Sequence, residues 1–92
     1  MELEPDITQE IEKEFNRSLR SSVQEALISL ETVPEFQRVA RCVLFLAGGD
    51  EGRLAHFVTA AHTDYRDVIW WAEYDGKEER LRDFARPFTV GN

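Results

Sequence analysis

Apolar residues recur every four positions through the first 27 residues of this 92-residue chain, which is typical of amphipathic helices. Each step of four advances about 400°, so the apolar stripe drifts about 40° per step at 3.6 residues per turn. One straight helix cannot turn the whole series toward one core, so the pattern predicts two helices with a break between them. The series is Leu3, Ile7, Ile11, Phe15, Leu19, Val23 and Leu27.

We expect this break at Ser21-Ser22, because Ser22 and Glu25 have the spacing of a capping box. In that motif the serine side chain binds a free backbone N–H group of the first turn, and the glutamate binds the backbone N–H of the serine. The expected helices cover about residues 6–20 and 23–32. One long curved helix is the alternative, since neither glycine nor proline interrupts the segment.

The third helix is expected to be the central, most buried element. Thr32 is a suitable N-cap, and Pro34 suits the first turn, where its missing N–H costs nothing. Gly48-Gly49 ends the helix. Residues 42–46 alone would also fit a buried strand, but the helical pattern begins two turns earlier. The helix is apolar nearly all round at its end, and its main face carries Phe36, Val39, Ala40, Val43, Leu46 and Ala47.

Two further helices are predicted, each beginning at an aspartate that can cap it. Asp50 precedes a helix with one apolar face, and Asp64 precedes a helix that ends at Asp75-Gly76. Asp67 would lie near the positive end of the last helix dipole. The inner faces of the two helices are Leu54, Phe57, Val58 and Ala61, followed by Tyr65, Val68, Ile69 and Ala72.

Residues 77–92 form a tail in which Pro87 forbids a long helix. The tail is expected to be irregular, or helical only over about residues 77–85; a hairpin turn at Asp75-Gly76 is the lesser alternative. The fold class is therefore all-α. We expect residues 1–92 to form a single compact domain of four to five short helices, with residues 1–5 frayed and the tail packed on the domain.

The composition excludes several classes of protein. The chain has 11 Lys and Arg residues against 18 Asp and Glu residues, a net charge of −7, which argues against a nucleic-acid partner. The longest apolar run, Cys42–Ala47, is far shorter than the roughly 20 residues of a membrane span. The acidic start is unlike a signal peptide. Since Cys42 is the single cysteine, no intramolecular disulfide forms, and a cytoplasmic location is expected.

The aromatic residues of the last helix are the leading candidate for a binding surface. Trp70 and Tyr74 lie on the side opposite the inner face, and Trp71 is adjacent. Arg66, one turn before Trp70, can stack on its ring. Tryptophan, tyrosine and arginine are enriched at binding hot spots, so the sequence predicts a protein–protein interaction module or a self-associating protein. Phe45, which points away from the main face of its helix, is a further candidate.

Two alternatives compete with this prediction. Leu81, Phe84 and Phe88 of the tail could fold over the aromatic residues and make them part of the core. A small metal-binding protein or metal-dependent enzyme could instead use His62, Asp64 and Asp67 as ligands; in the simpler interpretation, both aspartates serve the N-terminus of a helix.

No convincing catalytic set or cofactor motif is present, so a binding protein without a cofactor is expected rather than an enzyme. Cys42 is flanked by apolar residues, which favours a buried thiol over a nucleophile. The acidic charge allows a third, weaker hypothesis, in which the protein mimics nucleic acid and blocks a basic surface. The segments 41–50 and 64–74 resemble small uncharacterised bacterial proteins of similar length, over about residues 33–88; this resemblance implies no activity.

Overall fold

The structure is a computed structural model that describes residues 2–75 and 77–88. The described residues form helices and irregular segments, with no strand among them, so the all-α prediction is confirmed. The longer helices are α1 (Pro5–Glu14), α2 (Arg17–Ile28), α3 (Phe36–Ala47) and α4 (Glu51–Ile69). A 3-10 turn, η1 (Ser29–Thr32), follows α2, and a π-helical turn, η2 (Trp70–Tyr74), continues α4.

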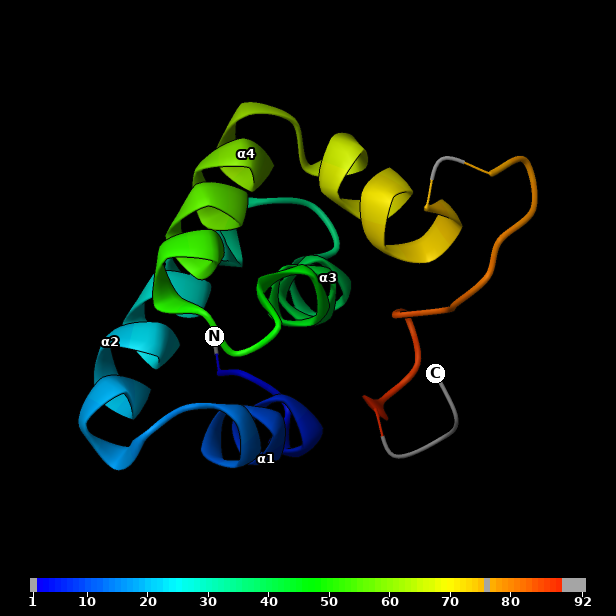
Figure 1. The fold of residues 1–92 in the computed structure, drawn as a ribbon. Helices are drawn as coiled ribbons and strands as arrows, with labels where there is room; N and C mark the ends of the chain where they lie inside the picture. Colours follow the sequence, from blue (N-terminus) through cyan, green and yellow to red (C-terminus); the bar gives the residue numbers. More distant parts are fainter. Residues whose placement is uncertain (1, 76, 89–92) are drawn as a thin grey trace.

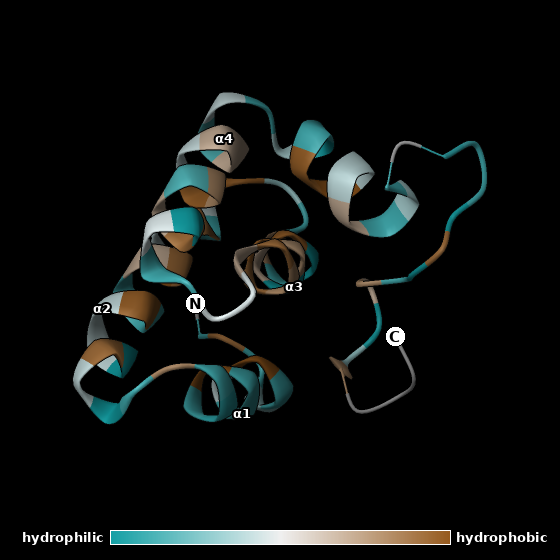
Figure 2. Cartoon of the chain, viewed as in Figure 1, coloured by the Kyte–Doolittle hydropathy of each residue, from teal (hydrophilic) through white to brown (hydrophobic). Residues whose placement is uncertain are grey.

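Helix α3 is the central element, as expected. In Figure 1 it is surrounded by α1, α2 and both halves of α4, while the tail descends from η2 along the remaining side toward α1. Eight of the twelve residues of α3 are buried. The hydrophobic faces of the surrounding helices turn inward toward it (Figure 2). None of the described helices combines the length and apolar character needed to cross a membrane.

The break between the first two helices lies at Phe15-Asn16, so the prediction of a break at Ser21-Ser22 is wrong. Phe15 has an extended backbone and is only 3% exposed, which keeps its ring in the core while the chain changes direction. Arg20 compensates the open end of α1 by donating hydrogen bonds to the carbonyl oxygens of Phe15 and Glu12. Ser22 lies inside α2, where its hydroxyl donates to the Leu19 carbonyl rather than capping a helix.

Helix α3 also begins later than predicted. Thr32 ends the η1 turn and Pro34 lies outside the helix, so neither has its expected capping role. The N-cap position is Glu35, whose φ of 57° places it in the left-handed region, and Phe36 is the first helical residue. The predicted end is confirmed: Gly48, with a φ of 57°, donates its N–H to the Leu44 carbonyl.

Both aspartate caps are confirmed. The Asp50 carboxylate accepts a hydrogen bond from the Arg53 N–H at 2.9 Å. Asp64 leaves the helical region with φ −157° and ψ 100°, and its carboxylate accepts from the Arg66 N–H at 3.1 Å. The predicted fourth and fifth helices are therefore the two halves of α4, which bends sharply at Asp64 before η2 (Figure 1).

The described part of the tail is irregular and packed on the domain. Residues 77–88 contain neither the short helix over 77–85 nor a strand of a hairpin. Phe84 is 1% exposed, and its ring lies between those of Phe45 and Phe88, with centroid distances of 5.2 and 5.8 Å. The tail therefore contributes a core residue to the fold; the expectations for residues 89–92 lie outside the described residues.

Candidate functional site

Trp70, Trp71 and Tyr74 form the aromatic surface of the molecule, at the end of the long fourth helix. The rings of Trp70 and Tyr74 stack with a centroid distance of 4.8 Å and an angle of 21°. This contact follows from their spacing, because residues four apart lie on the same side of a helix. Trp70 is 43% exposed and Trp71 is 40% exposed, so large areas of both indole rings face solvent.

The rings are carried by η2, whose backbone is fixed by buried residues and by a main-chain hydrogen bond. Ala72 and Glu73 are fully buried. The Asp75 N–H donates to the Trp70 carbonyl at 3.2 Å, which closes the π-helical turn. Turns of this kind are rare and frequently occur at functional sites. On the side of α4, the Phe57 ring packs edge-on against Trp71 with a centroid distance of 6.0 Å.

Residues 77–88, the described part of the tail, do not cover the aromatic surface, so the alternative in which Leu81, Phe84 and Phe88 fold over it is wrong. Leu81 is itself 52% exposed, and Phe84 packs with Phe45 and Phe88 instead. The tail is directed there by main-chain bonds: the N–H groups of Leu81 and Arg82 both donate to the Glu73 carbonyl.

Phe45 and Arg66 do not join the aromatic surface in the way the sequence suggests. Phe45 belongs to the cluster with Phe84, and the Arg82 guanidinium lies 4.5 Å from the centroid of its ring. Arg66 binds Asp64 through two side-chain hydrogen bonds of 3.0 and 3.1 Å rather than stacking on Trp70. These bonds lower the pKa of the Asp64 carboxyl group.

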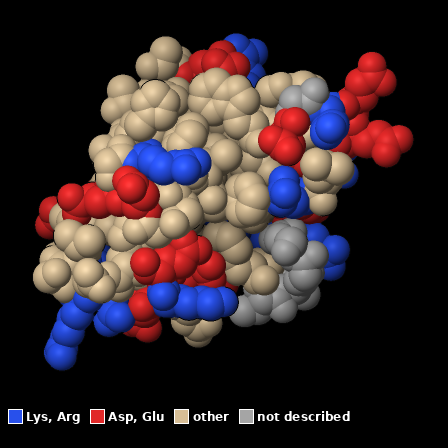
Figure 3. Space-filling view, in the orientation of Figure 1, with Lys and Arg blue, Asp and Glu red and all other residues tan. Residues whose placement is uncertain are grey.

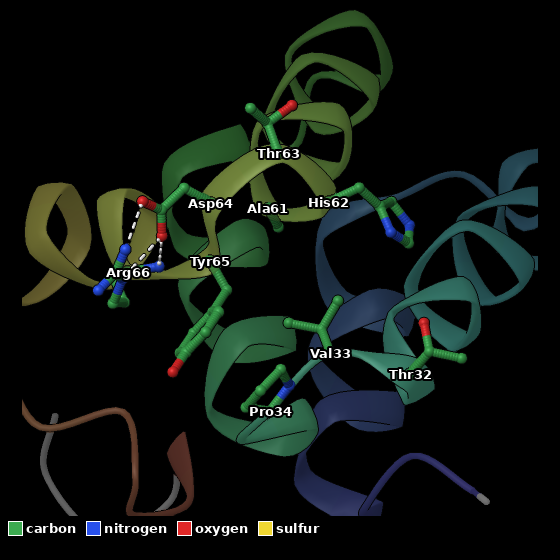
Figure 4. A pocket seen from close by; sticks show the side chains of 9 residues that line it. All are labelled: Thr32, Val33, Pro34, Ala61, His62, Thr63, Asp64, Tyr65 and Arg66. Carbon is green, nitrogen blue, oxygen red and sulfur yellow. Dashed lines mark hydrogen bonds and ion pairs between the residues drawn. The ribbon is translucent and has the colours of Figure 1, made fainter.

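The bend at Asp64 leaves a hollow of about 430 Å³ between α4 and the segment that enters α3 (Figure 4). His62 lines it but turns toward η1, where its Nε2 lies 3.1 Å from the Ser29 hydroxyl. Asp64 points to the opposite side and binds Arg66 (Figure 4). Among the described residues, no three His, Cys, Asp or Glu side chains gather in a way that could hold a metal ion. The metal hypothesis for His62, Asp64 and Asp67 remains a prediction, with no support from this geometry.

The feature that the sequence analysis missed is a pair of buried ion clusters under the tail. In the first, Arg41 donates to both carboxylate oxygens of Asp6, and it also binds Glu4. Burial alone would raise the pKa of Asp6, but the hydrogen bonds from Arg41 and from the Phe88 N–H outweigh it and lower that pKa. Arg41 is 1% exposed and donates to the Phe84 carbonyl as well.

The second cluster surrounds Glu73, which is fully buried directly beneath the aromatic surface. Arg38 donates to both of its carboxylate oxygens at 2.7 and 2.8 Å, and these bonds raise the pKa of Arg38. Arg80 lies 3.2 Å from the same carboxylate, and the Phe84 N–H donates to it at 3.0 Å. Both clusters therefore fasten the tail to the helices, and the second also holds the turn that carries Trp70 and Tyr74.

One sequence signal could have located these clusters. Arg38 and Arg41 are three positions apart in α3, the central helix, and the residues between and after them in the sequence are apolar. A charged residue in such a position needs a carboxylate partner, because an unpaired buried charge is very costly. The prediction for Cys42 is confirmed: it is fully buried, and burial raises the pKa of its thiol, so it is not poised as a nucleophile.

Comparison with known proteins gives no assignment: no protein-family model, curated protein or solved structure matches this chain. The resemblance to small bacterial proteins therefore assigns no family. The function has to be argued from the geometry of the described residues.

Proposed function

We propose that this protein is a protein–protein interaction module whose aromatic surface, Trp70, Trp71 and Tyr74, contacts an apolar patch on a partner protein. The observation that carries the proposal is the combination of exposed and buried groups in one turn. Two indole rings face solvent, while Ala72 and Glu73 of the same turn are fully buried. Large rings on a rigid backbone lose little conformational freedom on binding, which is one reason why they dominate interfaces.

The surrounding charges define the kind of partner. Exposed carboxylates lie along the chain on both sides of the aromatic surface, at Asp67 and Asp75 and then at Glu78 and Glu79. The cations next to them are Lys77 and Arg80, and the Arg80 guanidinium is paired with Glu73 and Asp83. Arg66 is neutralised by Asp64. A matching partner therefore presents apolar side chains with Lys or Arg residues around them. Such complementary charges accelerate encounter and reject acidic partners.

The same charge argument makes a second copy of this chain a poor partner. Each copy carries a net charge of −7, so two copies repel one another at low ionic strength. On the face shown in Figure 3, acidic and basic groups are interspersed rather than gathered into one extended acidic patch. That distribution gives no support to the hypothesis of a nucleic-acid mimic, which needs a continuous acidic surface. We expect this protein and its partner to meet in the cytoplasm.

The proposal can be tested by site-specific photo-crosslinking in cells that naturally express the protein. In the test protein, a benzophenone amino acid replaces Trp71, at the edge of the aromatic surface. In the control protein it replaces Ile28, which lies on α2 and is 38% exposed. We expect position 71 to capture a partner with a basic, apolar surface, and position 28 to fail to capture it. The double variant Trp70→Ala/Tyr74→Ala should weaken binding of the purified partner at least tenfold.

Two controls test whether binding depends on this surface and on its charges. Leu81→Ala removes an exposed apolar side chain outside the surface and should leave binding unchanged. Raising the salt concentration should slow association with the wild-type protein, because exposed charges are screened. If the Trp70→Ala/Tyr74→Ala variant keeps its melting temperature and binds the partner as tightly as the wild type, the proposal is wrong.

A further inference from the structure

The tail lies against η2 in the manner of a bound peptide, through its main-chain groups. The N–H groups of Leu81 and Arg82 donate to the Glu73 carbonyl at 2.7 and 3.1 Å. The Phe84 N–H donates to the carboxylate of the same glutamate at 3.0 Å. Peptide-binding sites commonly combine main-chain hydrogen bonds, which give affinity, with pockets for individual side chains, which give specificity.

The contacts of the tail continue from η2 to α3 and α1, along the path that Figure 1 shows. The Phe84 carbonyl accepts a hydrogen bond from Arg41 of α3 at 3.1 Å. The Phe88 N–H donates to Asp6 of α1 at 3.1 Å. The groups that hold the tail form one surface, which we call the tail seat. It consists of Asp6, Arg41, Phe45, Ala72 and Glu73.

Two side chains of the tail have contacts of their own in this seat. Phe84 is the buried residue among residues 77–88, at 1% exposed, and its ring lies 5.2 Å from that of Phe45. The Arg82 guanidinium lies 4.5 Å from the centroid of the same Phe45 ring and donates to the Ala72 carbonyl at 3.2 Å. The tail seat thus accepts an arginine followed two positions later by a phenylalanine, a pattern written Arg-x-Phe.

The tail fills its seat incompletely. A hollow of about 290 Å³ remains between the tail, α1 and α3, beside Arg82 and Phe84. Another, of about 430 Å³, lies where the small side chain of Ala85 adjoins Arg38 and Arg41 of α3. Closely packed protein interiors leave few voids larger than a water molecule. The seat therefore has room for a segment with larger side chains than those of the tail.

Charge favours a basic occupant of the tail seat from another protein. Residues 77–88 hold four of the eleven Lys and Arg residues and three of the eighteen Asp and Glu residues. The rest of the chain therefore has seven cations against fifteen carboxylates, a net charge of −8, which attracts a basic segment. A second copy of this chain fits less well, because it brings its own net charge of −7.

We propose that the tail seat binds a segment of another protein that carries Arg-x-Phe, and that the chain's own tail occupies the seat until such a segment displaces it. The tail is tethered beside its seat, so it competes at a high effective concentration and rejects weak ligands. The seat does not include Trp70, Trp71 or Tyr74, so this proposal does not rest on the proposed function.

The test uses the full chain with Phe84→Ala, in which the tail stays attached but lacks its buried ring. The probe is a fluorescein-labelled peptide with the sequence of residues 77–88, and fluorescence anisotropy measures its binding. We expect the peptide to bind the variant roughly tenfold or more tightly than it binds the wild type, because the tethered tail competes less well. It should also raise the melting temperature of the variant. Leu81→Ala, which changes an exposed side chain of the tail, should bind the peptide as weakly as the wild type.

A second pair of peptides decides whether the seat accepts a foreign segment. One keeps Arg-x-Phe and has serine or alanine at all other positions of the tail sequence; its matched control has the two residues exchanged, as Phe-x-Arg. We expect the first to bind the Phe84→Ala protein and the second not to bind. If the first fails to bind, the seat serves only the chain's own tail; if both bind equally, the attraction is non-specific. Either result would overturn the proposal.

Arg82→Ala in the full chain is a second variant, in case Phe84→Ala does not fold. It removes the contact with the Phe45 ring and the hydrogen bond to the Ala72 carbonyl, so the tail peptide should bind it more tightly than the wild type. Equal binding of the tail peptide to the wild type and to both variants would contradict the proposal, because the tail would then not occupy the binding site.

Analytical ultracentrifugation distinguishes a foreign segment from the tail of a second copy. We expect the wild type and both variants to remain monomeric as their concentration rises, since like net charges repel. A wild-type dimer that is lost in Phe84→Ala would show that two copies exchange their tails, and it would overturn the assignment of the seat to another protein.

Discussion

Arg41 and Asp6 form a two-point ion pair inside the protein, with Nε 2.9 Å from Oδ2 and Nη2 3.1 Å from Oδ1. The two residues are 1% and 8% exposed. The pair extends into the tail, because Arg41 donates to the Phe84 carbonyl and Asp6 accepts from the Phe88 N–H. One ion pair thus joins α1, α3 and the last described turn of the chain.

Arg41→Ala is expected to lower the free energy of unfolding by about 3–5 kcal/mol, because it leaves the Asp6 carboxylate buried without its partner. Urea denaturation at neutral pH measures this loss. The control is Arg66→Ala, which removes the exposed ion pair with Asp64 and should lower the free energy of unfolding far less, because solvent screens exposed pairs. Similar losses for the two variants would show that burial of the Arg41 pair has no special role.

Glu73→Gln is expected to loosen the tail while the helices persist. The substitution keeps the shape of the side chain but leaves the Arg38 guanidinium without its buried countercharge. Hydrogen exchange should accelerate at the Phe84 amide, which donates to the Glu73 carboxylate. Glu79→Gln changes an exposed residue nearby and should leave that amide as protected as in the wild type. Unchanged protection of the Phe84 amide in Glu73→Gln would refute this role.

Phe84→Ala is expected to destabilise the fold by about 3–5 kcal/mol without altering the tryptophan emission of the folded protein. The ring is 1% exposed and packs with Phe45 and Phe88, whereas both indoles are already exposed. Denaturation and native-state fluorescence together check this. Leu81→Ala should change stability by no more than about 0.5 kcal/mol. A red shift in folded Phe84→Ala would mean that the tail shields the tryptophans.

Glu14 is expected to make the protein less stable as the pH rises from about 4.5 to 7. Burial and the hydrogen bond with Glu10 raise its pKa from 4.5 to about 7, so the folded state holds a proton that the unfolded state releases. The unfolded state therefore binds fewer protons in this window, and the stability contributed by protonated Glu14 is lost as pH rises through 7. Melting temperatures of wild type and Glu14→Gln across pH 4–8 test this; the variant should show the flatter profile, while Glu12→Gln should retain the slope.

Asp64→Ala is expected to lower the melting temperature, because the second half of α4 loses its cap. The carboxylate accepts the Arg66 N–H where the backbone leaves the helical region. Thermal denaturation gives the difference. Asp67→Ala, three residues later, removes an interaction with the helix dipole but no cap, and it should lower the melting temperature less. Equal costs would mean that the cap at the bend contributes nothing beyond the charge.

Several local features were predictable because their causes lie within a few residues. Asp50 and Asp64 cap helices through N–H groups three and two positions away, and Gly48 ends α3 in the left-handed region. The outward direction of Trp70 and Tyr74 follows from helical angles alone. The exposure of Trp70 and the stacking of Tyr74 on its ring agree with that prediction, whereas their role in binding remains a proposal.

The sequence by itself determined the helical class, the central place of α3 and the aspartate caps, since periodicity and capping act over a single turn. Only the tertiary structure decided the break at Phe15-Asn16, the path of the tail and the burial of Arg41. The physical reason is the distance along the chain between interacting groups. Arg41 is tolerated in the core because Asp6, 35 positions away, neutralises it, and no local pattern specifies such a partner.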